Sequence, residues 1–220
     1  MTGERRRRLA VALAVVLSAA FALLAHFAIL EGVPPTVGAL LSLVPLAGLA
    51  LWALRRTRYA AAAWAAVAAL GVSLWLGWGQ LERHFPSLFF VEHAGANLVL
   101  GLLFGRTLVA GREPLCTRFA RLLHGALPPE VERYTRQVTV AWTAFFAALF
   151  ALSCTLYLGG FLAAWSFLAN IASPLLIAAM FVVEYAVRLR ALPHWERVGI
   201  LGGIRAFSRH FGAARFEAPR

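Results

Sequence analysis

The sequence predicts an all-α, polytopic membrane protein with six transmembrane helices and short interfacial amphipathic helices. Of its 220 residues, 61% are hydrophobic and only 14% are charged, and the mean hydropathy is +0.73. Six apolar stretches of about 18 to 22 residues are each long enough, as a helix, to cross a hydrocarbon core of roughly 30 Å. These expected spans are residues 9–30, 37–54, 59–78, 88–109, 138–158 and 166–187. Only short connections remain, so residues 1–220 are expected to form a single transmembrane domain.

The arginines are distributed unevenly around these spans. All 21 basic residues are Arg and all ten acidic residues are Glu. Twenty of the 21 arginines lie on one side of the predicted membrane: in the two termini, in the connections 55–58 and 110–137, and at Arg106. Arg83 is alone on the other side. Because positively charged loops stay in the cytoplasm, this pattern predicts that both termini are cytoplasmic. The remaining connections are expected to face outward, away from the cytoplasm; they are residues 31–36, 79–87 and 159–165. The position of the arginines also explains the net charge of +11 without nucleic-acid binding, which is not expected.

The first span follows a basic segment, Arg5 to Arg8, as the core of a secretory signal peptide would. Its apolar run of about 22 residues exceeds the roughly 7 to 15 of a signal-peptide core, so we expect it to be retained as a membrane helix.

The fourth span contains most of the polar side chains expected at membrane depth. The candidate polar membrane site combines these with one residue each from the first and sixth spans: Glu92, His93, Asn97, His26 and Asn170. Such residues either handle protons or a polar substrate, or they form hydrogen bonds between helices. Adjacent positions on a helix point about 100° apart, so Glu92 and His93 face one small site only if the helix bends. Gly101 and Gly105 form a G-x-x-x-G pattern that predicts close approach of another helix.

The connection 110–137 contains a predicted amphipathic helix over residues 114–124. Its apolar face consists of Leu115, Phe119 and Leu122. Its cationic face consists of Arg118 and Arg121. Gly125 is expected to end this helix. It is interpreted either as a helix on the inner membrane surface, with its arginines among anionic headgroups, or as an ordinary cytoplasmic connection.

The fifth span is predicted to be the end of a longer helix that begins near Glu130, just after a Pro-Pro pair, and runs to Leu158. An i, i+4 pair of Glu132 and Arg136 supports this helix. After the sixth span, the tail 188–220 is predicted to contain a second interfacial helix.

Charged residues near the cytoplasmic ends of the spans form a second candidate site, for a lipid headgroup or a protein partner. Its members are Arg106, Arg112, Arg118, Arg121, Arg133, Arg136, Glu184 and Arg188. Glu184 and Arg188 have the favoured order for a helical ion pair. Such a pair either anchors the ends of the spans or forms an inner-leaflet entrance for a headgroup or acyl chain.

Neither a metal site nor a cofactor site is predicted, because no Cys or His spacing typical of metal ligands occurs. The catalytic residues are unknown. Cys116 lies near Arg118, which could lower the pKa of its thiol, but no motif places a general base beside it. Trp142 and Trp165 are expected, with other tryptophans, to act as anchors at the membrane interfaces.

Three stretches resemble a family of bacterial multi-pass inner-membrane proteins that are encoded beside aryl-polyene or xanthomonadin-type biosynthesis genes. They are LFGRTLVAGREPLCTRFARLLHG (103–125), ERYTRQVTVAWTAFFA (132–147) and SFLANIASPLLIAAMFVVEYAVR (166–188). The neighbouring genes resemble a type II fatty-acid synthase system. The resemblance therefore implies an acyl carrier protein or an acyltransferase as a partner, besides anionic membrane lipid. Proteins of this kind are sometimes labelled ketosynthases, but this chain lacks the length and layout of the soluble, thiolase-like fold that a ketosynthase needs.

The sequence thus favours a non-enzymatic accessory protein that docks or hands over a lipid-like biosynthetic intermediate at the cytoplasmic face. One alternative is a small transporter or flippase for a lipid-like product, with polar groups of spans one, four and six along its path. A second alternative is a membrane-embedded acyl-transfer enzyme.

Overall fold

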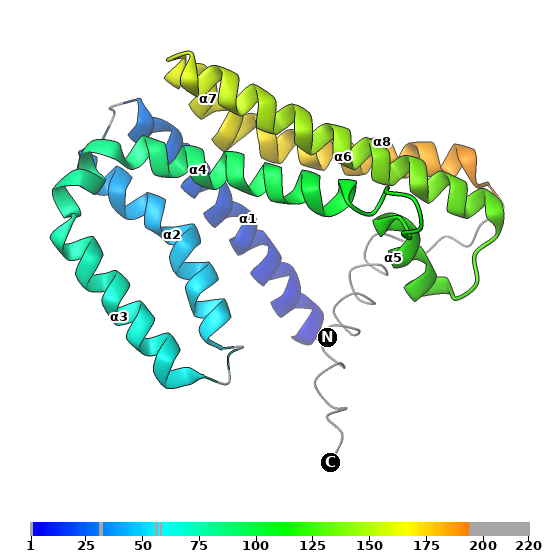
Figure 1. Ribbon diagram of the computed structural model, residues 1–220, viewed down its shortest axis with the longest axis horizontal. Helices are drawn as coiled ribbons and strands as arrows, with labels where there is room; N and C mark the ends of the chain where they lie inside the picture. The colour runs from blue at the N-terminus through cyan, green and yellow to red at the C-terminus, as the bar shows by residue number, and fades with distance from the viewer. Residues whose placement is uncertain (1, 31–32, 56, 58, 194–220) are drawn as a thin grey trace. The chain divides into compact units, whose positions relative to one another are not determined.

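A computed structural model describes residues 2–30, 33–55, 57 and 59–193, and within these residues the chain is helical with no strand. This confirms the predicted all-α class. In chain order, the elements are α1 (Thr2–Ile29), α2 (Pro35–Leu54), α3 (Ala60–Leu76), α4 (Trp78–Gly105), α5 (Leu115–His124), α6 (Pro129–Leu158), α7 (Leu162–Phe167), the π-helical turn η1 (Leu168–Ala172) and α8 (Ser173–Ala191) (Figure 1).

The described helices are those of a membrane-embedded protein. Four helical segments are long and apolar enough to cross a bilayer: Leu9–Ile29, Trp78–Gly105, Pro129–Leu158 and Leu162–Ala191. The apolar parts of α2 and α3 are shorter. Large hydrophobic side chains are widely exposed, including Val15 at 63%, Trp75 at 81% and Leu76 at 80%. Contiguous exposed apolar surface on this scale is stable against lipid and not against water.

Local sequence signals explain the helix boundaries that were predicted correctly. Helix α5 covers the expected amphipathic segment and ends at Gly125, whose φ of +77° lies in a region that residues with a Cβ rarely adopt. Helix α6 begins at Pro129, with Glu130 and Glu132 in its first turn, and continues without interruption to Leu158. Proline and acidic residues favour a helix N-terminus because the first N–H groups there are unpaired.

The prediction that residues 79–87 form a connection is wrong, since α4 begins at Trp78 and this segment is helical. The helix is kinked at His84, where φ is −122° and ψ is 16°. Pro86 explains the kink, because proline lacks an N–H and its ring clashes with the preceding helical turn.

The sixth predicted span lies in one helical segment, Leu162–Ala191, within which the π-helical turn η1 separates α7 from α8. Pro174 follows the π-helical turn and cannot donate a backbone hydrogen bond to the preceding turn. The wider turn therefore lies where the regular α-helical ladder is already broken. The predicted helix in the tail lies almost entirely in residues 194–220, outside the described residues.

Backbone contacts group the chain into two compact units. The first unit consists of Met1–Leu98 and Ala148–Ile177, and the second consists of Val99–Ala147 and Ala178–Arg220. Helices α4, α6 and α8 contribute residues to both units.

The core of the first unit is built from small residues of α1 and α2 and from aromatic residues of α4 and α7. Its buried members are Ala25, Ala28, Ile29, Ala39, Phe85, Phe89 and Trp165. A Cβ added at Gly38 would lie 2.5 Å from Cε2 of Phe85, so the Phe85 ring packs directly on the α2 backbone and would have to shift if this position carried a side chain. Trp165 is completely buried, and its ring centroid lies 5.1 Å from that of Tyr157. Trp165 is therefore a core residue and not the interfacial anchor that was expected.

The core of the second unit centres on Trp142, which is 6% exposed and packs against Phe146 and Phe181 with centroid distances of 5.4 and 4.8 Å. Trp142 is thus also a core residue. A Cβ at Gly101 would lie 3.6 Å from Cβ of Phe146, and one at Gly105 would lie 3.2 Å from Cγ2 of Thr143. The glycine pair therefore does allow the predicted close approach, and the approaching helix is α6.

Candidate functional site

Helix α5 is held against α6 by hydroxyl groups. Thr117 is 3% exposed, and its Oγ1 lies 2.8 Å from Oγ1 of Thr135. One turn further along α6, Oγ1 of the fully buried Thr139 accepts a hydrogen bond of 3.2 Å from the backbone N–H of Cys116. The two α6 threonines also donate to carbonyls of their own helix, to Val131 and Thr135 respectively. Helix α5 is therefore fixed in position by a buried polar seam.

The connection between α4 and α5 is also tied down. The hydroxyl of Thr107 donates to the carbonyl of Phe104 over 2.6 Å and accepts from the N–H of Leu115 over 3.0 Å. Nη2 of Arg136 donates to the carbonyl of Leu108 over 3.3 Å. Both ends of this connection are thus bonded to neighbouring residues.

Arg121 of α5 joins two carboxylates. Its Nη1 lies 3.0 Å from Oε1 of Glu113, in an ion pair without hydrogen-bond geometry, and its Nη2 donates to Oε1 of Glu132. The predicted pair of Glu132 with Arg136 is therefore replaced, because α5 brings a cation to Glu132 from another helix. These groups are about half exposed, so each pair contributes roughly 0.2 to 1 kcal/mol.

The other arginines of this region remain exposed. The segment 105–137 contains six Arg and three Glu. Four of its arginines are exposed and have no ion-pair partner among the described residues: Arg106, Arg112, Arg118 and Arg133. We call these four residues the arginine face. They are free to meet an anion.

Glu184 and Arg188 form the ion pair that the sequence predicted, with Nε of Arg188 3.6 Å from Oε1 of Glu184. Tyr134, which is 8% exposed, directs its hydroxyl to the backbone oxygen of Glu184 at 3.1 Å and to Oε1 of the same residue at 3.2 Å. The guanidinium of Arg188 also lies 5.4 Å from the ring centroid of Tyr185. These contacts link α6 to α8 within the second unit, so Glu184 and Arg188 already have partners inside the protein.

Cys116 does not have the lowered pKa that its nearness to Arg118 suggested. Burial raises the pKa of its thiol by more than a hydrogen bond with Thr139 lowers it, and the negative charge of Glu184 adds a smaller upward effect. A raised pKa reduces the thiolate that a nucleophilic cysteine needs. Both cysteines of the chain are free.

The candidate polar membrane site forms two hydrogen-bonded clusters in the first unit. In one cluster, His93 of α4 lies between two serines, with Nδ1 3.0 Å from Oγ of Ser153 and Nε2 3.0 Å from Oγ of Ser173. Asn97 donates from Nδ2 to the carbonyl of His93 over 2.8 Å, and the indole N–H of Trp165 donates to Oγ of Ser153 over 2.9 Å. We call this cluster the His93 bridge.

In the other cluster, Nδ1 of His26 lies 2.8 Å from Oγ of Ser166, and Asn170 donates to the carbonyl of Ser166 over 3.0 Å. Glu92 belongs to neither cluster. One of its carboxylate oxygens is buried and accepts no hydrogen bond from the described residues. The structure therefore engages four of the five candidates in hydrogen bonds and separates Glu92 from them.

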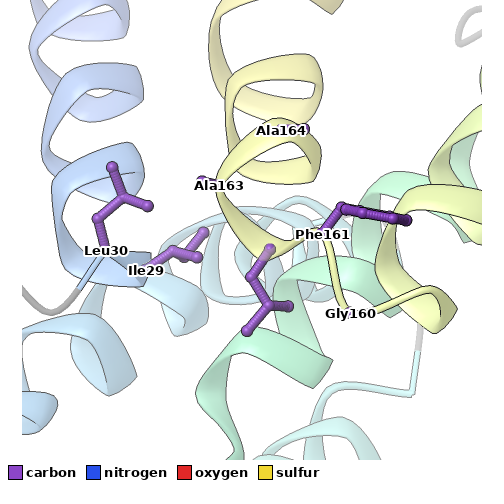
Figure 2. A pocket seen from close by; sticks show the side chains of 7 residues that line it. Ile29, Leu30, Gly160, Phe161, Ala163 and Ala164 are labelled. Atoms are coloured by element: carbon purple, nitrogen blue, oxygen red, sulfur yellow. The ribbon is translucent and has the colours of Figure 1, made fainter.

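A shallow apolar pocket of about 480 Å³ lies where α1 ends and α7 begins (Figure 2). It is lined by Ile29, Leu30, Gly160, Phe161, Leu162, Ala163 and Ala164. The side chains that line it contain only carbon (Figure 2). None of the five polar candidates lines this pocket, so it offers no polar site for catalysis.

The partners of the predicted residues were not foreseen from the sequence. Ser153, Ser166 and Ser173 are buried hydroxyls, and a single serine in an apolar stretch carries no signal of its partner. The threonines that hold α5 were detectable, because residues 135, 139 and 143 are all Thr and the spacing of four aligns them on one face of a helix.

Among the described residues, no group of three or more His, Cys, Asp or Glu side chains could hold a metal ion. Comparisons with protein families, with curated proteins and with solved structures found no match for this chain.

Proposed function

We propose that the chain is a non-enzymatic accessory protein of a bacterial inner membrane, which docks an acidic partner through its arginine face. The observation that carries this proposal is the attachment of α5 to α6. Buried contacts of Thr117 and Cys116 fix the helix, while Arg106, Arg112, Arg118 and Arg133 stay exposed without a carboxylate partner among the described residues.

Fixed, exposed cations suit a docking surface. Exposed arginines without carboxylate partners among the described residues, four of them within residues 106–133, attract an acidic partner over about a Debye length. They speed its association more than they tighten the final complex. Guanidinium groups also bind carboxylates and phosphates through paired hydrogen bonds. Arg118 lies on α5, and the other three lie on α6 or on the connection between α4 and α5, whose ends are bonded to neighbouring residues. A fixed backbone lowers the entropic cost of presenting these groups.

The proposed topology has six crossings with both termini in the cytoplasm. Helix α3, at 17 residues, would measure about 26 Å, which is at the short end of the range for a crossing. The arginines at 55, 56 and 58 support crossings by α2 and α3, because without them these arginines would lie outside. Helix α5 lies on the cytoplasmic side in either case, since α2 and α3 form a pair.

The partner we propose is an acyl carrier protein or an acyltransferase that brings a lipid-like intermediate to the membrane. This choice rests on the resemblance of residues 103–125 and 132–147 to proteins encoded beside aryl-polyene-type genes. Carrier proteins are acidic, as the arginine face requires. Anionic lipid headgroups offer the same chemistry and are the competing ligand.

The polar residues of the first unit give the transporter alternative less support. Four of the five candidates already bond to protein groups, and the described pocket is lined by hydrocarbon.

The proposal is tested by measuring carrier-protein binding to the full chain in nanodiscs of uncharged lipid. The double variant Arg118→Gln/Arg133→Gln is expected to bind at least about tenfold more weakly, and the binding of the native chain is expected to weaken as salt is added. Arg83→Gln is the matched control, because Arg83 is also exposed and is expected on the opposite side of the membrane. Equal binding by the native chain and the double variant would refute docking at this face. Binding only to discs of anionic lipid, without carrier protein, would identify the headgroup as the ligand.

A further inference from the structure

Helix α5 is attached to α6 at the point where α6 becomes apolar. The hydrogen bonds that hold α5 are made to Thr135 and Thr139 of α6. The first turns of α6, residues 130–136, contain four charged side chains, whereas residues 137–158 contain none. Because a membrane-spanning segment loses its charged residues where it enters the hydrocarbon, α5 lies at the level of the membrane surface.

The apolar side of α5 faces away from α6. Thr117 is the residue whose side chain bonds to α6. Successive residues of an α-helix are turned by about 100°, so Leu115, Phe119 and Leu122 each lie roughly 140 to 160° around the helix axis from Thr117. The polar attachment therefore occupies one side of the helix, and the predicted apolar face occupies the opposite side. Leu122 is 49% exposed there, and the neighbouring Leu123 is 38% exposed.

A cation and the surface of a membrane-spanning helix lie beside these leucines. Arg118, one helical turn before Leu122, is exposed and has no ion-pair partner among the described residues. Val140 of α6 is 48% exposed and directly follows Thr139, to which α5 is bonded. The exposed apolar surface of α6 thus begins where α5 is attached. Leucines and an arginine together at such an edge are typical of a helix that lies between headgroups and acyl chains.

We propose that the apolar face of α5 is a lipid-binding surface, covered by the leaflet on the side of the membrane where α5 lies. Leu122 and Leu123 enter the boundary between headgroups and acyl chains, which removes their exposed apolar surface from water. The guanidinium of Arg118 then lies at the level of the lipid phosphates, to which it can donate paired hydrogen bonds.

Lipid contact determines where a partner of the arginine face can bind. Helix α5 is held on one side by α6 and on the other by lipid, so Arg118 lies beside the headgroups. A partner that binds Arg118 therefore also meets the leaflet, which suits the transfer of a lipid-like molecule. The inference concerns the apolar face, and it does not depend on whether a carrier protein binds the arginine face.

The inference is tested with spin labels on the full chain in nanodiscs of phosphatidylethanolamine and phosphatidylglycerol. Both native cysteines are replaced in the variant Cys116→Ala/Cys154→Ala, and Leu122→Cys carries the label. Relaxation of the label by oxygen, which dissolves in lipid, is compared with relaxation by a nickel chelate, which stays in water. The oxygen-to-nickel ratio at Leu122→Cys is expected to be at least about threefold higher than at Glu130→Cys, an exposed position in the first turn of α6.

Leu152→Cys is the lipid reference, since Leu152 is 45% exposed in the membrane-spanning part of α6. Leu123→Cys repeats the measurement at the second leucine and is expected to give a similarly raised ratio. Ratios at both leucines equal to that at Glu130→Cys would overturn the proposal, because the apolar face would then lie in water. Low access of both oxygen and nickel would also overturn it, because a second copy of the chain or another protein would then cover this face.

Discussion

The polar residues of the two units differ in whether their hydrogen-bonding capacity is used inside the protein. In the first unit, Ser153, Ser173 and Asn97 are buried and bonded to His93. In the second unit, Arg118 and Arg133 are exposed and have no ion-pair partner among the described residues. Polar groups within a bilayer must be satisfied by the protein itself, whereas groups at its edge can be left for water or a ligand. Apart from Glu92, whose buried Oε1 has no hydrogen bond among the described residues, burial therefore separates the residues that support the fold from those available for binding.

The largest expected effect comes from removing a side chain that the structure places in the core of the first unit. Trp165→Ala should lower the free energy of unfolding by about 3 to 5 kcal/mol, because it leaves a large cavity and removes the indole N–H bonded to Ser153. Thermal and denaturant-induced unfolding in micelles would measure the loss. Trp75→Ala is the control: Trp75 is 81% exposed, so its removal should change stability by less than about 0.5 kcal/mol. Equal effects of the two substitutions would mean that Trp165 faces lipid.

A second, smaller effect tests the close contact between α2 and α4. Gly38→Ala should destabilise the protein by about 1 to 3 kcal/mol, since the added Cβ would overlap the buried ring of Phe85 and force it to move. Gly48→Ala on the same helix meets nothing within 4 Å and should be neutral or stabilise the protein by up to about 1 kcal/mol. The same unfolding measurements apply. A stabilising Gly38→Ala would contradict the packing described for the first unit.

The sequence predicted the features that depend on nearby residues. The boundaries of α5 and α6 follow from Gly125 and Pro129, and the ion pair of Glu184 with Arg188 follows from a spacing of four. The prediction failed where residues distant in sequence decide the outcome. Glu132 pairs with Arg121 of another helix, and Trp165 is covered by the first unit instead of facing an interface.

The segment 79–87 shows a different limit. Its charged residues and Pro86 suggested a connection, but the structure tolerates them inside a kinked helix. Glu82 explains part of this tolerance, because its Oε1 accepts hydrogen bonds from the hydroxyl of Thr36 and the indole N–H of Trp78. Hydropathy could not reveal these partners, since one of them is more than 40 residues away in the sequence.

The smallest effect concerns the second unit, where the arginine face depends on the attachment of α5. Thr139→Val keeps the shape of the side chain but removes the acceptor for the N–H of Cys116, which should cost about 0.5 to 1.5 kcal/mol. Hydrogen exchange of residues 115–124 should become faster, by an amount that corresponds to a similar loss in the free energy of local opening. The exchange of residues 85–97 should stay unchanged because they belong to the other unit. Thr155→Val is the matched control, since the Thr155 hydroxyl is exposed and bonds only to the carbonyl of Ala151 in its own helix. If Thr139→Val left the exchange of α5 unaltered, the buried hydroxyl seam would not be what fixes this helix, and the arginine face would lose its rigid support.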